Sequence, residues 1–340
     1  FDYHLVPFEE GAFPAGVASV MPYYGIPVGQ TSEDVGFGYN KDIITGLLRQ
    51  RYGFDGVICT DWGLVSESRI KPPAAWGVED LSEIDRVAKI LDAGCDMLGG
   101  ESRPDLVLAL VESGRVSESR IDESVRRILR DKFRLGLFDD PFVAMGDVWK
   151  AGHYDKMELG KTSMRRSLTL LKNEGGVLPL KNKPKLYVEG MDTDIAWQHG
   201  EVVRQPAQAD VVILKLHTPY EERKATLLDR FFRQGRLYYS EEEMARVRAL
   251  AAHGKPMVAI VNLERGAILT EINSLSAALI ADFGSTDEIV FELLSGQFQP
   301  TGRLPIELPS SWEAVQQQQE DMPYDSKAPL YPFGAGLQGF

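Results

Sequence analysis

The chain has 340 residues, of which 44% are hydrophobic and 26% are charged, a composition typical of a globular protein long enough for two domains. Its net charge of −13 argues against nucleic acid and against a membrane as partners, since nucleic acids and anionic lipids repel an acidic protein. No apolar run approaches the ~20 residues that a membrane-spanning helix needs.

Short apolar runs alternate with helical patterns in the first half of the chain. The runs predict strands buried on both sides, and the alternation predicts a parallel sheet. The predicted strands are 16–24, 55–62 and 95–100, and the predicted helices are a stretch containing Ile43, Ile44, Leu47 and Leu48, then 81–94, 103–114 and 117–138. Ser82 and Gly94 mark the ends of one helix, and Gly136 suggests a C-cap for the last. Only about three βα units fit here, whereas a (β/α)8 barrel needs eight.

The second half of the chain shows another alternation. Residues 139–184 look like a linker and a docking helix, and the pattern after them is that of a doubly wound α/β domain. The predicted strands are 185–190, 210–217, 256–263 and 275–284, and the predicted helices are 240–253 and 286–296. We therefore predict an α/β protein with three parts, residues 1–140, 141–184 and 185–340.

Neither a metal nor a cofactor is expected. No His, Cys or carboxylate cluster has the spacing of a zinc site, and no G-x-G-x-x-G follows a strand. Cys59 and Cys95 are each flanked by apolar residues, so we predict buried free thiols.

Asp61 is the strongest candidate for a functional group. It lies at the carboxyl end of a predicted buried strand, where α/β barrels carry their catalytic groups. Trp62 follows it, and an indole beside a carboxylate offers a flat apolar surface to a sugar ring. The alternative is a carboxylate that caps the next turn or helix around Gly63.

Five segments together resemble the family 3 glycoside hydrolases of the β-glucosidase type. They are GFDGVICTDWG (53–63), VMPYYGIP (20–27), LLKNEGGVLPL (170–180), GRLPIELP (302–309) and PLYPFGAGL (329–337). The first resembles the segment of the family that carries the nucleophile, and the third the opening of its second domain. The resemblance implies the carboxyl-terminal βα units of a (β/α)8 TIM-type barrel, followed by an α/β sandwich domain.

The resemblance also implies a mechanism. Retaining glycosidases use two carboxyl groups about 5–5.5 Å apart, one as nucleophile and one as acid/base. Asp61 matches the nucleophile of the family. The acid/base of two-domain members is a glutamate on a loop of the second domain, which points here to Glu222 or to Glu221. We favour Glu222; the alternative is that both are solvated charges beside Arg223 and Lys224.

Further residues are candidates for substrate contact. Tyr24 matches a strand-end tyrosine of the family, although it could equally be a core aromatic. His217 ends a predicted strand just before the proposed acid/base, where a structural role is the alternative. Glu101 either lines the site or, as we favour, caps the helix that begins near Pro104.

The chain departs from the family pattern at its start. The family barrel begins upstream, with an aspartate, an arginine and a Lys-His pair that grip the sugar, and none of these is present. Phe1 is not a methionine and the opening reads as mid-domain sequence, so localisation stays open. We expect a fragment, or a chain that needs the missing segment or a companion chain. The predicted function is a retaining exo-β-glycosidase acting on an oligosaccharide or β-glycoside, and the alternative is a truncated, non-catalytic homologue that binds sugar or needs a partner.

Overall fold

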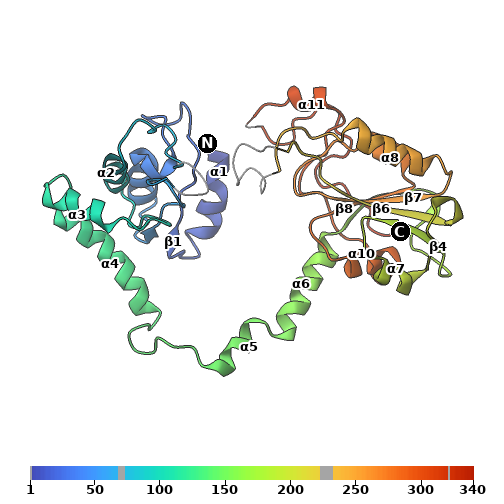
Figure 1. The fold of residues 1–340 in the computed structure, drawn as a ribbon, viewed down its shortest axis with the longest axis horizontal. Coiled ribbons are helices and arrows are strands. Elements are labelled where there is room, and N and C mark those ends of the chain that lie inside the picture. The colour runs from blue at the N-terminus through green and yellow to red at the C-terminus, as the bar shows by residue number, and fades with distance from the viewer. Residues whose placement is uncertain (1, 68–72, 223–232, 321) are drawn as a thin grey trace. The chain divides into compact units, whose positions relative to one another are not determined.

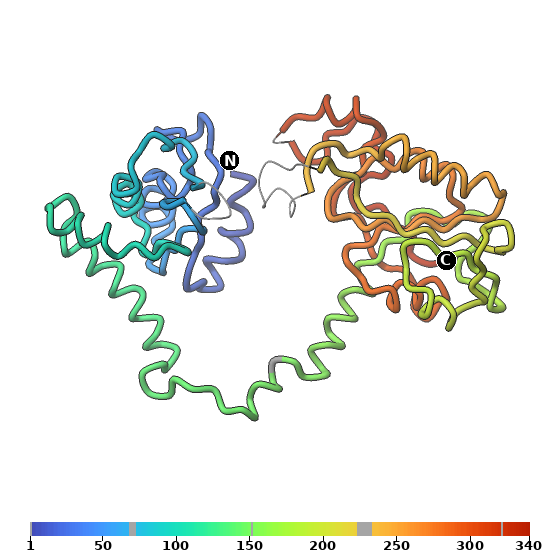
Figure 2. The backbone as a smooth tube through the Cα atoms, viewed as in Figure 1, coloured from blue at the N-terminus to red at the C-terminus, as the bar shows by residue number. Residues whose placement is uncertain are grey.

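The computed structural model describes residues 2–67, 73–222, 233–320 and 322–340. The described residues up to Ala144 form one compact unit, and those from Met145 onward form a second. Figure 1 shows the elements of each unit, and Figure 2 follows the backbone through them.

The first unit has short strands and many helical segments. Its elements are α1 (Asp2–Pro7), η1 (Phe8–Ala12), β1 (Ser19–Val20), η2 (Phe37–Tyr39), η3 (Asp42–Arg51), β2 (Val57–Ile58), α2 (Glu83–Ala93), α3 (Pro104–Glu112) and α4 (Glu118–Arg134). β1 and β2 pair in parallel, and Cys59 makes an isolated parallel bridge to Met97. The three predicted strands are therefore in the right places and the right direction, but each is much shorter than its apolar run.

The helices of the first unit agree better with the sequence. Ser82 is the N-cap of α2, where its hydroxyl accepts the Asp85 N–H at 3.3 Å, and Gly94 ends the helix in the left-handed conformation, both as predicted. α4 ends at Arg134 and Gly136 follows at φ +69°, so the helix is shorter than the predicted 117–138. The barrel assignment stays a prediction, since three parallel strand segments do not define a closed barrel.

The core of the first unit lies between the helices and the strand segments. Ile44, Ile58 and Ile90 are fully buried in it. The apolar side chains along α4 are incompletely covered, since Val125, Leu129 and Phe133 remain 39–63% exposed. Cys95 is buried and Cys59 is half-buried, and both are free thiols.

The second unit is built on a six-stranded sheet with the order β3-β8-β7-β6-β4-β5. Its helical elements are η4 (Met145–Asp147), α5 (Val148–Ala151), α6 (Tyr154–Ser167), η5 (Glu174–Gly176), α7 (Thr193–His199), η6 (Pro206–Gln208), α8 (Glu241–Ala251), α9 (Thr270–Leu275), α10 (Asp287–Leu294) and α11 (Trp312–Gln316). Its strands are β3 (Thr169–Asn173), β4 (Lys185–Glu189), β5 (Glu201–Val202), β6 (Val211–His217), β7 (Met257–Asn262) and β8 (Ala278–Asp282). All neighbours are parallel except β3, which runs antiparallel to β8.

Helices cover both faces of this sheet, as a doubly wound domain requires (Figure 1). One apolar layer joins Val212 and Leu214 to Val247 of α8, and the other joins Ile213 and Ile260 to helices α7 and α10. The four predicted strands and two predicted helices of the domain are all present. β3 was not predicted; it falls inside the predicted linker and docking helix and forms one edge of the sheet.

Candidate active site

Asp61 follows the last paired residues of the β2 segment. The Thr60 N–H donates to the carbonyl of Met97 at 3.0 Å, and the Thr60 hydroxyl accepts the Gly99 N–H at 2.8 Å. Both bonds tie the backbone just before Asp61 to the neighbouring segment at the carboxyl end of the strands. Asp61 itself is half-buried, and its Oδ1 accepts the N–H of Trp62 at 2.7 Å. The carboxylate thus stands at the strand end that the sequence indicated.

Tyr24 lies beside Asp61 and Trp62. Its hydroxyl donates to the Trp62 carbonyl at 2.6 Å. Burial, and then the hydrogen bond and negative charge of Asp61, raise the pKa of Tyr24 well above its ordinary value of 10.0. The phenol therefore stays protonated near neutral pH and can serve as a hydrogen-bond donor beside the carboxylate.

The indole of Trp62 lies against two glycines. A Cβ on Gly100 would come within 2.1 Å of the ring carbon Cδ1, and a Cβ on Gly99 would come within 2.0 Å of the Thr60 carbonyl oxygen. Gly100 also adopts φ +64°, a conformation that other residues rarely adopt. The glycines let the ring lie close to the backbone, yet 56% of Trp62 stays exposed. This leaves an apolar surface next to the carboxylate.

Side chains from three other segments fix the turn that follows Asp61. The hydroxyl of the buried Tyr39 donates to the Leu64 carbonyl at 2.6 Å, and Arg86 donates to the Val65 carbonyl at 3.1 Å. Glu101 Oε1 accepts the N–H groups of Val65 at 2.8 Å and Ser66 at 3.1 Å. These bonds replace the strand ladder that the two-residue β2 lacks.

The prediction that Glu101 caps a helix is wrong. The helix that begins near Pro104 has Arg103 at its N-cap without a side-chain cap, so Glu101 does not cap it. Its carboxylate instead satisfies two backbone N–H groups of the turn after Asp61. In the sequence, only the two glycines before Glu101 mark this position as unusual. They do not indicate that its carboxylate binds the backbone of Ser66, 35 residues earlier.

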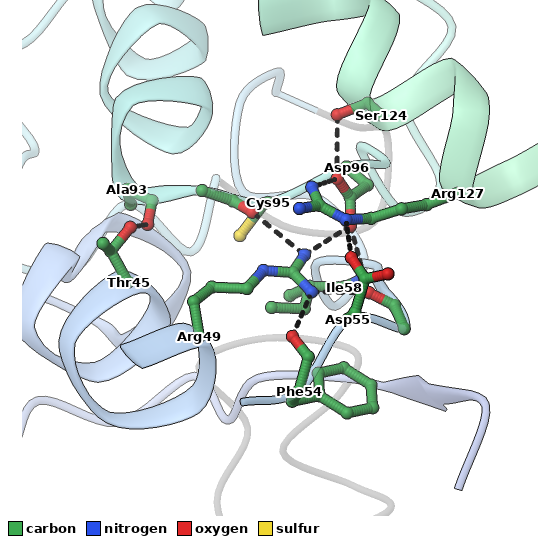
Figure 3. Close-up of polar contacts among 12 residues, drawn as sticks. Thr45, Arg49, Phe54, Asp55, Ile58, Ala93, Cys95, Asp96, Ser124 and Arg127 are labelled. Carbon is green, nitrogen blue, oxygen red and sulfur yellow. Dashed lines mark hydrogen bonds and ion pairs between the residues drawn. The ribbon is translucent and has the colours of Figure 1, made fainter. Parts of the chain in front are cut away.

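A charged network surrounds Asp96 and reaches Ile58, the last residue of β2, and it was not predicted from the sequence. The side chain of Asp96 is fully buried, and its two oxygens lie 2.7 Å from Arg49 Nη2 and 3.0 Å from Arg127 Nη1. It also accepts the Ser124 hydroxyl at 2.9 Å and the Ile58 N–H at 2.9 Å. Figure 3 shows the two guanidinium groups converging on this carboxylate. With all these partners the network anchors the strand segments around Ile58.

The remaining candidates are in the second unit, at the carboxyl end of β6. His217 is exposed, and its carbonyl accepts the Tyr239 hydroxyl at 2.9 Å. The Glu221 N–H donates to the Gln234 carbonyl at 2.8 Å, and Glu221 Oε1 accepts the Arg236 N–H at 3.3 Å. Glu222 follows and is exposed. The alternative, that both glutamates are solvated charges beside Arg223 and Lys224, involves two residues that lie outside the described part of the chain.

Two models of one family match the chain. The glycosyl hydrolase family 3 N-terminal domain matches residues 1–130, and the family 3 C-terminal domain matches residues 189–339. The chain belongs to glycosyl hydrolase family 3. The five segments that suggested this family lie within or between the two matched ranges.

Family 3 relatives named as glycosidases match almost the whole chain. β-Glucosidase C of Emericella nidulans is 42% identical over 99% of this chain and 56% of its own length. The periplasmic β-glucosidase/β-xylosidase of Dickeya chrysanthemi is 37% identical over 98% of this chain and 54% of its own length. The chain therefore spans about half the length of these curated relatives.

Solved structures of β-glucosidases share the fold. The β-glucosidase from Listeria innocua aligns with a TM-score of 0.75 at 22% identity, over 98% of this chain and 53% of that one. A β-glucosidase from Erythrobacter marinus aligns with a TM-score of 0.78 at 23% identity, over 98% of this chain and 54% of that one. At this identity the likeness is one of fold.

The described residues hold neither a metal-binding cluster nor a membrane-spanning helix. Among the described residues, no group of three or more His, Cys, Asp or Glu side chains could hold a metal ion. Within the same part of the chain, no helix combines the length and the apolar character that crossing a bilayer demands.

Proposed function

We propose that this family 3 chain carries part of the active site of a retaining exo-β-glycosidase of the β-glucosidase type. The observation that carries the proposal is the position of Asp61, a half-buried carboxylate at a strand end with a protonated phenol and an exposed indole beside it. The names of the 42% and 37% identical relatives support a β-glycoside as substrate.

Asp61 is the proposed nucleophile. Its carboxylate oxygen attacks the anomeric carbon of the terminal sugar, and the bond to the leaving oxygen breaks as the covalent glycosyl-enzyme forms. The Trp62 N–H donates to Asp61, and the Tyr24 hydroxyl, which donates to the Trp62 carbonyl, lies close by. The exposed indole of Trp62 suits the apolar face of a pyranose. His217 remains a candidate for substrate contact from the second unit.

The acid/base is proposed to be Glu222, with Glu221 as the alternative. This group donates its proton to the leaving oxygen, and it then takes a proton from the water that hydrolyses the glycosyl-enzyme. Glu221 already accepts the Arg236 N–H, and its carboxylate packs where a side chain on Gly235 would lie. These contacts hold Glu221 against the loop backbone, and the preference for Glu222 comes from the resemblance to the family.

The decisive test is Asp61→Asn in the natural protein. We expect at least a 10³-fold loss of kcat for an aryl β-glucoside, because the nucleophile forms the covalent intermediate and the remaining groups cannot replace it. Glu33→Gln, an exposed carboxylate paired with Lys89, serves as the matched control. A near-wild-type rate in Asp61→Asn would refute the assignment.

Azide distinguishes the two glutamates. Removal of the acid/base leaves a glycosyl-enzyme that azide can attack from the face the leaving group vacated, so the product is the β-glycosyl azide. Glu222→Ala with an activated aryl β-glucoside should be rescued and form this product, whereas Glu221→Ala should not. Rescue of Glu221→Ala alone would reverse the assignment.

A second candidate function is a chain that binds sugar without hydrolysing it, or that needs a companion chain. The exposed apolar side chains of α4, such as Phe133 at 63%, favour it because such surfaces usually contact another surface. Two results together would support this alternative. The natural protein would bind cellobiose without hydrolysing it, and Asp61→Asn would leave that binding unchanged.

A further inference from the structure

Two arginines of the second unit lie close to Glu221. Arg265, which follows β7, donates from Nη2 to the carbonyl of Gly235 at 2.8 Å. The next residue after this glycine, Arg236, donates its backbone N–H to Glu221 Oε1 at 3.3 Å. One peptide group therefore connects the guanidinium of Arg265 to the carboxylate of Glu221, and the side chain of Arg236 branches from the same point of the chain.

Each of these two guanidinium groups contains a buried nitrogen that has no hydrogen-bond acceptor in the described part of the chain. The nitrogens are Nε of Arg236 and Nη1 of Arg265, and both residues are half-buried. A buried donor without an acceptor is unfavourable, and more so when it carries a charge. Native proteins supply such donors with a protein acceptor, a water molecule or a ligand. An anion suits two guanidinium groups best, because it offers both a negative charge and several lone pairs.

The carboxylates close to the two arginines are engaged elsewhere. Glu264 Oε2 lies 3.0 Å from Arg233 Nε, and Glu221 Oε1 accepts a backbone N–H rather than a guanidinium. Over the described residues, neither Arg236 nor Arg265 forms an ion pair with an acidic side chain. In a chain with 50 acidic and 37 basic residues, two half-buried arginines without an acidic partner indicate a site for an anion from outside the chain.

The backbone around the two arginines is held in place before any ligand binds. The Ile268 N–H donates to the carbonyl of Leu237 at 2.8 Å, which ties the chain after β7 to residues 233–239. Gly235 adopts φ +76°, and a Cβ there would lie 2.4 Å from Glu221 Oε2, so this position excludes a side chain. A site that is ordered in advance loses less entropy when its ligand binds.

We propose that Arg236 and Arg265 bind a negatively charged leaving group, so that the chain acts on acidic β-glycosides. Under the proposed function, Glu222 or Glu221 protonates the oxygen of the leaving group. Because Glu221 is bonded to the backbone of Arg236, the group that the arginines bind is the one attached to that oxygen. This assignment rests on the proposed function, and it names the chemical class of the substrate.

The first test measures binding to the natural protein and needs no turnover. Dissociation constants are compared by calorimetry for 4-hydroxybenzoate and for 4-hydroxybenzamide, which has nearly the same shape and no charge. The unaltered protein should bind the acid about tenfold more tightly, as expected for charge-assisted hydrogen bonds. Arg236→Gln and Arg265→Gln should each remove most of this preference, whereas Arg236→Lys, which keeps the charge, should retain part of it. Arg204→Gln is the matched control, since Arg204 is exposed and follows the edge strand β5.

The second test compares turnover of 4-carboxyphenyl and 4-carbamoylphenyl β-glucosides. Arg236→Gln should lower kcat/KM for the charged glucoside by about tenfold more than for the neutral one. Equal Kd values for the acid and the amide overturn the anion site, as does a preference that Arg204→Gln reduces as much as Arg236→Gln. A loss of kcat/KM that is equal for both glucosides overturns the assignment to the leaving group. Failure of the proposed function is detected separately, by turnover that Asp61→Asn does not reduce.

Discussion

The two compact units hold their parallel strands by different means. In the second unit, helices cover both faces of a six-stranded sheet, and Val258, Ala259 and Ile260 of β7 are fully buried. In the first unit, β1 and β2 have two residues each, and the chain around them is held by hydrogen bonds from buried side chains such as Asp96 and Tyr39. The stability that comes from buried apolar area is distributed over many residues, whereas the stability of a buried polar network depends on each of its members. The proposed nucleophile is in the unit that depends on single side chains.

The strongest way to break this contrast is Asp96→Ala. The change leaves the partly buried Arg49 and Arg127 without the Asp96 carboxylate, and the loss of one partner from a buried ion pair costs about 3–5 kcal/mol. Hydrogen exchange followed by mass spectrometry should show faster exchange in peptides around β2 and unchanged exchange around β7. Equal acceleration in both units would mean that they unfold together. Asp92→Ala is the matched control, because its pair with Lys41 is exposed and contributes at most about 1 kcal/mol.

Gly100→Ala should have a smaller effect on stability and a clear effect on the site. It combines a left-handed backbone with a methyl group 2.1 Å from the Trp62 ring, so the indole must move and the unit loses about 1–3 kcal/mol. We expect a shift of tryptophan fluorescence and a lower affinity for sugar. Gly114→Ala is the matched control, since it has φ +70° but nothing within 4 Å. A fluorescence change as large in Gly114→Ala would remove the special role of Gly100.

Asp55 offers the smallest and most pH-dependent test. Hydrogen bonds from Arg130 and then Arg127 lower the pKa of Asp55 below its ordinary value of 3.8. Its contribution to stability is therefore present above about pH 4 and is lost as the pH falls below that value. Asp55→Asn should reduce the acid dependence of the first unit's unfolding midpoint between pH 5 and pH 3, by a small amount because the side chain is 65% exposed. An unaltered acid dependence would show that other carboxylates account for it.

Periodicity and capping predicted much of the fold. β6 and β7 appeared as apolar runs within one residue of their observed ends, because a strand buried on both faces has no polar positions to obscure it. The run 16–24 yielded only Ser19–Val20 as a strand, since apolar residues there also pack against helices without joining a ladder. β3 was missed because it follows α6 directly, and its only partner, β8, is more than a hundred residues away.

The site residues that belong to local sequence motifs were predictable, whereas those placed by long-range contacts were not. Asp61, Trp62 and Tyr24 came from local segments, and the structure brings these three together. The contacts of Glu101 and Asp96 were not predicted, because a charged residue beside an apolar run gives no sign that it will bind partners 35 and 47 residues away. Such long-range polar contacts have no period and no local signature.

The contact between Asp96 and the N–H of Ile58 has a consequence for strand alignment. A ladder two residues long has too few bonds to fix its own register, and a slip of one residue would exchange the two faces of the strand. The carbonyl of Ile58 accepts the N–H groups of Asp96 and Met97, while its own N–H is taken by the Asp96 carboxylate. No other residue of that neighbouring segment could supply this acceptor, so a slipped alignment would bury two arginines opposite a cysteine or a methionine. The register of β2 against the segment that holds Asp96, and with it the face on which Asp61 emerges, is thus selected by one buried acid.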